Sequence, residues 1–161
     1  MTHHLAPSNI ELLVQILNQG YSSKAWHGPN LRQSLRGVSA KNAAWRPGRG
    51  RHNIWEIVLH AAYWKYAVRR KLRGDKRVSF ALRGSNWFTR PTEDNSSDKA
   101  WREDLALLEQ EHQKLLEAVA GVAAGKSLKI PSRFIFGVAM HDVYHAGQIR
   151  LLRQLYAATE K

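Results

Sequence analysis

The sequence contains no cysteine, relatively few acidic residues and no long hydrophobic run. Without cysteine, the chain can form neither disulfide bonds nor thiolate metal sites, and it lacks a cysteine nucleophile. Any metal must therefore be held by histidine, aspartate or glutamate. No stretch of about 18 apolar residues is present to cross a bilayer, and the N-terminus lacks the basic and apolar segments of a secretory signal. We therefore expect a cytoplasmic protein that has no membrane partner.

The shortage of acidic residues leaves the chain strongly basic. Lys and Arg number 25 against 13 Asp and Glu, which gives a formal net charge of +12 and a pI near 10.4. This charge favours anionic partners, either nucleic acid or small acidic molecules, and a basic solvated surface without a partner is the alternative. The basic residues are dispersed over segments 46–52, 65–77 and 149–155, and no nucleic-acid recognition motif accompanies them. We expect no specific nucleic-acid partner, although a basic nucleic-acid-binding bundle is an alternative.

Hydrophobic periodicity predicts four long helices in one globular domain that spans residues 1–161. The expected long helices cover about 8–19, 53–74, 98–119 and the segment after Ser132, and a short helix is expected at 31–35. No strand pattern competes with these helices. The sequence therefore predicts an all-α fold, a four-helix bundle.

Four residues mark the ends of these helices. Ser8 and Glu11 have the spacing of a capping box, which predicts the start of the first helix. Asn53 is a suitable N-cap for the second long helix, and Gly74 is a suitable C-terminal stop. The second helix is apolar nearly all round, which indicates a central position in the bundle.

A long connection at residues 75–96 separates the second and third long helices. It exceeds the length of a typical connection in a small domain, and it contains Phe80, Trp87 and Phe88. We therefore expect a loop that crosses the bundle and packs its own aromatic side chains. One hypothesis is that Trp87 and Phe88 cover a substrate pocket, and plain core packing is the alternative.

The last long helix carries polar residues on the face that should be apolar. Its expected inward stripe reads Phe134, Val138, His141, His145, Gln148, Leu152 and Leu155. A buried polar group without a partner costs about 1–3 kcal/mol, so these residues need partners. His141 and His145 lie four residues apart and can direct their imidazoles at one point. This spacing is typical of a metal-ligand pair, and hydrogen bonding within the core is the alternative.

A third ligand would strengthen the prediction of a metal site. His60 lies within the apolar run of the second long helix, where an antiparallel neighbour could face the pair. His112 also lies on an inward stripe and competes for this place. We rank His60 first because its helix should be more deeply buried. The remaining histidines occupy terminal or loop positions and are expected to be solvated: His3, His4, His27 and His52.

Two segments together resemble the DinB/YfiT-like superfamily of small bundle proteins. They are HNIWEIVLHAAYWKYAVRRKL in the second helix and HDVYHAGQI in the last, and the resemblance covers nearly the whole chain. It implies an up-down-down-up four-helix bundle and a homodimer. It also implies that His60, His141 and His145 hold a divalent nickel, zinc or iron ion.

The resemblance further implies a reaction class. Relatives include thiol-dependent S-transferases that use low-molecular-weight thiols, while others are described as hydrolases and many have no assigned reaction. Three neutral imidazoles leave coordination positions open, which is the arrangement of a catalytic metal site. We therefore expect a metal-dependent enzyme, with thiol transfer to a small anionic substrate as the first hypothesis. Metal-dependent hydrolysis and a non-catalytic metal site are the alternatives.

Two further residues are candidates for a catalytic role. Gln148 could hydrogen-bond a ligand at the metal, and a bond between helices is the alternative. Glu56 lies four residues before His60 and could act as a general base or orient an imidazole, and helix capping is the alternative. Asp142 and Tyr144 are expected to face other sides of the last helix, in structural or dimer contacts.

Overall fold

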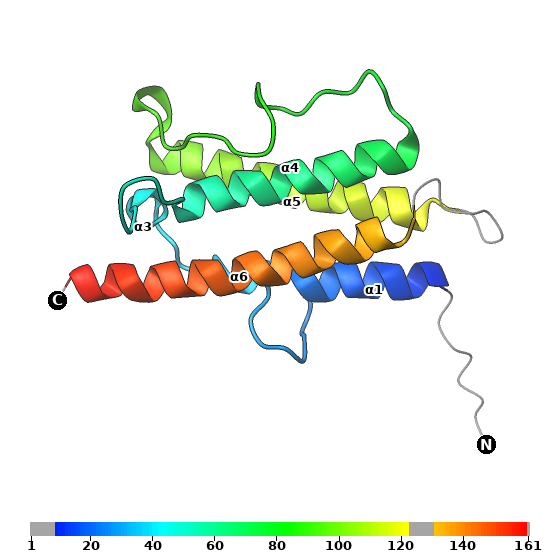
Figure 1. The fold of residues 1–161 in the computed structure, drawn as a ribbon, viewed down its shortest axis with the longest axis horizontal. Coiled ribbons are helices and arrows are strands. Elements are labelled where there is room, and N and C mark those ends of the chain that lie inside the picture. Colours follow the sequence, from blue (N-terminus) through cyan, green and yellow to red (C-terminus); the bar gives the residue numbers. More distant parts are fainter. Residues whose placement is uncertain (1–8, 123–130, 161) are drawn as a thin grey trace.

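The computed structural model describes residues 9–122 and 131–160, and every regular element in these ranges is helical (Figure 1). The elements are α1 (Asn9–Tyr21), α2 (Leu31–Ser34), α3 (Ala40–Ala44), α4 (Ile54–Arg73), the 3₁₀ helix η1 (Glu93–Asn95), α5 (Asp98–Ala120) and α6 (Arg133–Thr159). The predicted all-α class is confirmed. None of the described helices is both long and apolar enough to cross a membrane.

Four long helices pack lengthwise against one another. Helix α4 packs on α5 and α6, and α1 packs on α6 and α5. In Figure 1, α4 and α5 run from left to right, whereas α1 and α6 run from right to left. The long connection between α4 and α5 returns along the outer side of α4. Helices α4 and α6 are therefore neighbours, and each can direct side chains at the other.

The ends of the long helices follow the signals in the sequence. The side chain of Asn53 accepts a hydrogen bond from the backbone N–H of Glu56, as an N-cap should. Gly74 ends α4 in the left-handed conformation with φ of 72°, which glycine adopts readily. Ser97 caps α5 in the same manner as Asn53 caps α4. The capping box predicted for Ser8 and Glu11 lies partly outside the described residues.

The core fills the space between the four long helices. Trp55 of α4 is fully buried, and its indole N–H donates to Asp104 of α5 over 2.7 Å. At the crossing of α1 and α6, a Cβ added to Gly20 would lie 2.7 Å from the backbone oxygen of Ala139. Glycine is needed there because no side chain fits between the helices. This close contact sets the position of α6, which carries two of the candidate metal ligands.

The structure differs from the predicted helices at two places. Helix α3 was not expected, although its N-cap Ser39 accepts a hydrogen bond from the backbone N–H of Asn42. Asp142, expected in a structural or dimer contact, is completely buried and forms an ion pair with Lys65 of α4. Leu155 of the predicted inward stripe is 43% exposed. The stripe fails toward its C-terminal end because α6 extends beyond the helices that cover it (Figure 1).

The connection at 75–96 packs its aromatic residues, as predicted. Phe80 and Phe88 are buried and lie against each other with ring centroids 5.2 Å apart. Both also contact the ring of Tyr63 on α4. Trp87 is half-buried and turns instead toward the histidines described below. Only one of the two aromatic residues proposed to cover a pocket therefore reaches it.

Candidate metal centre

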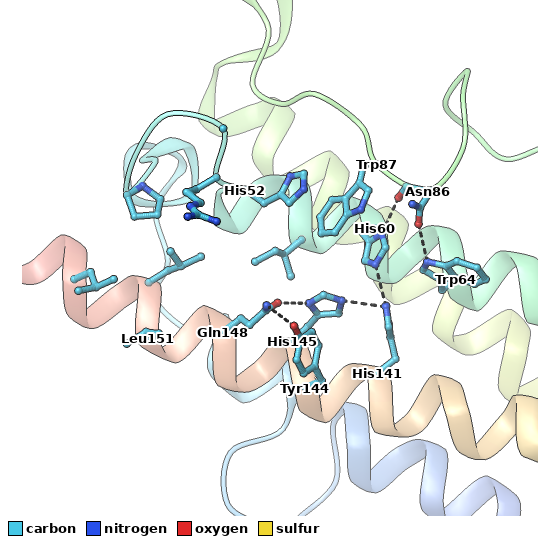
Figure 2. Close-up of a pocket in the computed structure, with 16 residues that line it drawn as sticks. His52, His60, Trp64, Asn86, Trp87, His141, Tyr144, His145, Gln148 and Leu151 are labelled. Atoms are coloured by element: carbon cyan, nitrogen blue, oxygen red, sulfur yellow. Dashed lines mark hydrogen bonds between the residues drawn. The ribbon is translucent and has the colours of Figure 1, made fainter.

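Three histidines converge between α4 and α6 (Figure 2). Nε2 of His141 lies 3.0 Å from Nε2 of His60 and 3.0 Å from Nε2 of His145. One ring nitrogen from each residue falls within 4.8 Å of the others. His60 and His145 are buried, and His141 is half-buried. The structure thus brings together the three residues singled out in the sequence as candidate ligands.

Two of the imidazoles are oriented through their opposite nitrogens. Nδ1 of His60 lies 2.8 Å from the backbone oxygen of Asn86, and Nδ1 of His145 lies 2.6 Å from Oε1 of Gln148. A carbonyl oxygen can only accept a hydrogen bond, so both histidines carry their proton on Nδ1. Their Nε2 atoms therefore present lone pairs to the centre of the cluster.

Burial keeps the three imidazoles neutral. It lowers the pKa of His141 to about 3, with further contributions from the neighbouring histidines and Lys65. Burial likewise lowers the pKa of His145 to about 4, against the opposing effect of its hydrogen bond with Gln148. The pKa of His60 is lowered for the same principal reason. Neutral imidazole is the form that binds metal ions.

Hydrogen bonding among the three rings cannot satisfy them all. A neutral imidazole has a single N–H, so His141 can donate to only one of its two neighbours. If its proton is on Nδ1 instead, that buried atom has no hydrogen-bond partner among the described residues. With the proton on Nδ1, nitrogen lone pairs therefore face each other over both 3.0 Å contacts, and with the proton on Nε2 one neighbouring lone pair still lacks a donor of its own. A divalent cation fits this donor set, because imidazole nitrogens bind zinc at about 2.0–2.1 Å and also suit nickel and iron.

The cluster lines a cavity of about 950 Å³. The wall comprises Pro47, Gly50, Arg51, His52, Ile57, His60, Trp64, Asn86, Trp87, His141, Tyr144, His145, Gln148, Leu151, Leu152 and Leu155. Leu151 of α6 lies at the end of the cavity away from His60, His141 and His145 (Figure 2). The cavity size is within the range of small-molecule sites, about 300–1,000 Å³.

Trp87 of the long connection covers one side of the histidine cluster. Its indole stacks on His60 with centroids 3.8 Å apart and on His52 with centroids 3.6 Å apart. The neighbouring Asn86 adopts a positive φ of 64° and accepts hydrogen bonds from His60 and Trp64. These contacts fix the connection to the ligand-bearing face of α4.

The other sequence candidates occupy defined positions. Oε1 of Gln148 accepts from His145, and its amide nitrogen donates to the hydroxyl of Tyr144 over 2.9 Å. Glu56 does not line the cavity, and its carboxylate contacts Arg46 and His52. Its side chain therefore orients an imidazole, but that of His52 and not that of His60.

Two other histidines lie outside the cluster. His112 is fully buried, as its inward position predicts, but it stacks on Tyr21 with centroids 3.9 Å apart and contacts Asn18. His52 is exposed, as predicted, but it also lines the cavity and pairs with Glu56. The spacing of His52 and Glu56, four residues apart at the start of a helix, is the signal that could have identified the pair.

A family model for the DinB superfamily matches residues 25–149. This span contains α2, α3, α4 and α5 and the part of α6 that carries His141, His145 and Gln148. The chain therefore belongs to the DinB superfamily, which confirms the resemblance. No curated protein and no solved structure matches the chain significantly.

Proposed function

We propose that this protein is a divalent-metal-dependent enzyme in which His60, His141 and His145 hold the ion. The observation that carries the proposal is the convergence of three neutral imidazole nitrogens at one end of an open cavity. A structural metal site is usually closed by four protein ligands, whereas three ligands leave a position for substrate. Nickel, zinc and iron are the candidate ions, because each accepts imidazole ligands.

The reaction we favour is transfer of a low-molecular-weight thiol to a small electrophile. A bound divalent ion supplies Lewis acidity, which favours the deprotonated form of a thiol or of water. The choice of a thiol rests on the family resemblance. The cavity supports it through its size, since about 950 Å³ can hold a small thiol beside its acceptor.

The residues around the ligands orient them and exclude solvent. Gln148 fixes the ring of His145, and Asn86 fixes the ring of His60. Such hydrogen bonds hold a ligand in the tautomer that leaves Nε2 available. Trp87 covers the face of His60 and keeps water from it. Gln148 also remains a candidate for contact with the substrate, because its side chain lines the cavity.

We also propose that each chain folds as the up-down-down-up bundle implied by the resemblance. We propose further that two chains associate in solution as a homodimer. The helix directions in Figure 1 support this topology. The exposed apolar side chain of Met140 on α6, which does not line the cavity, supports association. Sedimentation of Met140→Glu should show a monomer, whereas Leu12→Glu on the exposed side of α1 should sediment as wild type. A monomeric wild-type protein would contradict the proposal.

The function can be tested by measuring thiol transfer directly. Metal-loaded protein would be incubated with 2-mercaptoethanol, cysteine or glutathione and with 1-chloro-2,4-dinitrobenzene, and thioether formation followed by absorbance. Wild type and His27→Ala, which alters an exposed histidine, should react faster than His60→Ala. Equal rates for all three proteins would contradict a metal-dependent transferase. Turnover of esters without thiol would instead favour hydrolysis.

A further inference from the structure

His52 is held by a buried carboxylate at the edge of the cavity. Its Nδ1 lies 2.9 Å from Oε2 of Glu56, whose side chain is only 6% exposed. Arg46 donates to both oxygens of the same carboxylate, over 2.7 and 2.9 Å. An ionised carboxylate only accepts, so the proton of neutral His52 is on Nδ1. Nε2 is then the basic nitrogen, on a ring that is 47% exposed and lines the cavity.

The carboxylate of Glu56 is ionised at neutral pH. Burial alone would raise its pKa, but hydrogen bonds from Arg46 and His52 outweigh burial and hold the pKa below the usual value of a glutamate. An ionised partner fixes the orientation of the imidazole ring and stabilises the imidazolium that forms when Nε2 takes a proton. The Glu56 and His52 pair therefore has the parts of a carboxylate and histidine dyad.

Trp87 sets the distance between this dyad and the candidate metal centre. The rings of His52 and His60 are parallel to the indole within 3° and 7°, at centroid distances of 3.6 and 3.8 Å. Figure 2 shows the indole between the two imidazoles. A substrate that binds beside His60 can therefore extend past the edge of Trp87 and bring its leaving atom to His52. The dyad is too far away to serve as a fourth ligand, but all three rings line one cavity.

We propose that His52, oriented by Glu56, is the general acid and base of this cavity and gives a proton to the leaving group of the substrate. The proposal rests on the proposed function, because it assigns a step in the same reaction. A lone pair of the thiol sulfur or water oxygen forms the new bond to carbon, while the bond from carbon to the leaving atom breaks. Nε2 of His52 first takes the proton that the thiol or water gives up, which makes the ring an imidazolium beside Glu56. The leaving atom keeps the electron pair of the broken bond and takes this proton from Nε2, which returns His52 to its neutral form.

This assignment narrows the class of substrate. A leaving group that departs as a stable anion gains little from an acid, whereas an alkoxide or amine must be protonated as it leaves. The substrate should therefore carry an oxygen or nitrogen leaving atom. Its leaving group should also have an apolar body, since Leu151 and Leu155 line the cavity beyond Gln148. Esters and amides of small apolar alcohols and amines have this chemistry.

The dyad can be tested without any substrate. Diethyl pyrocarbonate acylates unprotonated imidazole nitrogens, and peptide mass spectrometry gives the rate at each histidine. At about pH 9, where imidazoles are unprotonated, the rate at His52 should fall several-fold in Glu56→Gln, because the ring loses the carboxylate that makes Nε2 more nucleophilic, while the rate at exposed His27 stays unchanged as an internal reference. Glu56→Asp, which keeps a charge beside Arg46 but withdraws it from His52, should show the same fall if Glu56→Gln does not fold. Equal rates at His52 in wild type and a folded variant would overturn the dyad.

The catalytic role is tested by varying the leaving group. Hydrolysis and 2-mercaptoethanol-dependent cleavage of p-nitrophenyl acetate and ethyl acetate would be compared in wild type, His52→Gln and His27→Gln. For ethyl acetate, His52→Gln should lose about 10²–10⁴-fold in rate, the usual contribution of general acid and base catalysis. For p-nitrophenyl acetate, whose leaving group needs no proton, the loss should be far smaller. A merely structural role would lower both rates equally.

The outcomes separate this inference from the proposed function. A normal metal content with equal losses for both esters, or with no loss, would overturn the role of His52 and leave the metal-dependent reaction standing. Rates that do not depend on His60 would overturn the proposed function. If wild type transfers a thiol to 1-chloro-2,4-dinitrobenzene but turns over neither ester, the catalytic role of His52 fails and the proposed function stands. A slower acylation of His52 by diethyl pyrocarbonate in Glu56→Gln would then support the pairing of His52 with Glu56 but no catalytic role.

Discussion

Lys65 of α4 and Asp142 of α6 form an ion pair in which neither side chain is exposed to solvent. Asp142 directly follows His141 in the sequence. The ion pair therefore joins α4 and α6, the two helices that carry the candidate ligands, beside the histidine cluster. Burial lowers the pKa of Lys65 and raises the pKa of Asp142, while their mutual attraction opposes both changes. The register between α4 and α6 is therefore fixed by charge as well as by apolar packing.

The pair predicts a large cost when only one partner is removed. Lys65→Met should lower the free energy of unfolding by about 3–5 kcal/mol, because it leaves Asp142 buried without a partner. The double variant Lys65→Met with Asp142→Leu should recover most of this loss. Lys99→Met removes an exposed pair with Glu103 and should change stability by less than about 1 kcal/mol. Urea denaturation of metal-free protein measures all three, and a mild effect of Lys65→Met would contradict this account.

Two glycines, Gly20 in α1 and Gly137 in α6, should respond to alanine substitution with stability changes of opposite sign. Gly20→Ala should destabilise the protein by about 1–3 kcal/mol, because the new methyl group would press on the backbone oxygen of Ala139. Gly137→Ala, inside α6 with no atom within 4 Å of the added Cβ, should stabilise it by about 0.5–1 kcal/mol. Thermal unfolding measures both. Similar changes in the two variants would mean that α1 and α6 are not in close contact at Gly20.

Much of the fold could be predicted because its signals are local. The N-cap at Asn53 and the stop at Gly74 depend only on residues close in the sequence. The burial of Asp142 could not be predicted, since a carboxylate is buried only when a distant residue, here Lys65, supplies its partner. The extent of the inward stripe on α6 could not be predicted from the sequence either, because it depends on which part of α6 the other helices cover. Val138 lies in the covered part and is buried, whereas Leu155 lies beyond it and is exposed.

The candidate site divides in the same way. His141 and His145 could be paired from their spacing on one helix, and His60 could be added from its apolar surroundings. The partners that orient them could not all be found. Asn86 acts through its backbone oxygen, which any residue would provide, and its placement depends on the path of the long connection. His52 stacks on Trp87 at the cavity, a contact that also depends on the path of the long connection.

Gln148 predicts a test of ligand orientation. Gln148→Ala should weaken zinc binding by about 10–100-fold, the usual effect of removing a hydrogen bond that orients a metal ligand. The reason is that Nδ1 of His145 loses its acceptor and the ring can rotate or change tautomer. Gln154→Ala, at an exposed position of the same helix, should bind zinc as wild type does. Competition with a chromophoric chelator measures both affinities, and equal affinities would exclude the orienting role.

His112 predicts a dependence of stability on pH. Burial first, and then the charges of Lys65 and Arg32, lower its pKa from 6.5 to about 2. In the unfolded chain, His112 takes up a proton near pH 6.5, whereas in the folded chain it stays neutral until far lower pH. The free energy of unfolding therefore falls as the pH drops below about 6.5. One such proton contributes about 1.4 kcal/mol per pH unit.

Replacing this histidine should remove its share of the slope. Metal-free wild type and His112→Phe would be unfolded in urea at several pH values between about 4 and 7, within the window where His112 contributes. The slope of stability against pH should be smaller by about 1.4 kcal/mol per unit in His112→Phe. His27→Phe, at an exposed position, should leave the slope unchanged. Parallel curves for wild type and His112→Phe would show that His112 takes up its proton in the folded state.

The central claim is that three histidines from two helices hold one metal ion. Its most direct test is the metal content of purified protein after loading with nickel, zinc or ferrous iron and removal of free ions, measured by plasma mass spectrometry. Wild type and His27→Ala should retain one ion per chain, and His141→Ala, which removes the nitrogen lying 3.0 Å from both other ligands, should retain none. Equal metal content in wild type and a folded His141→Ala would contradict the claim.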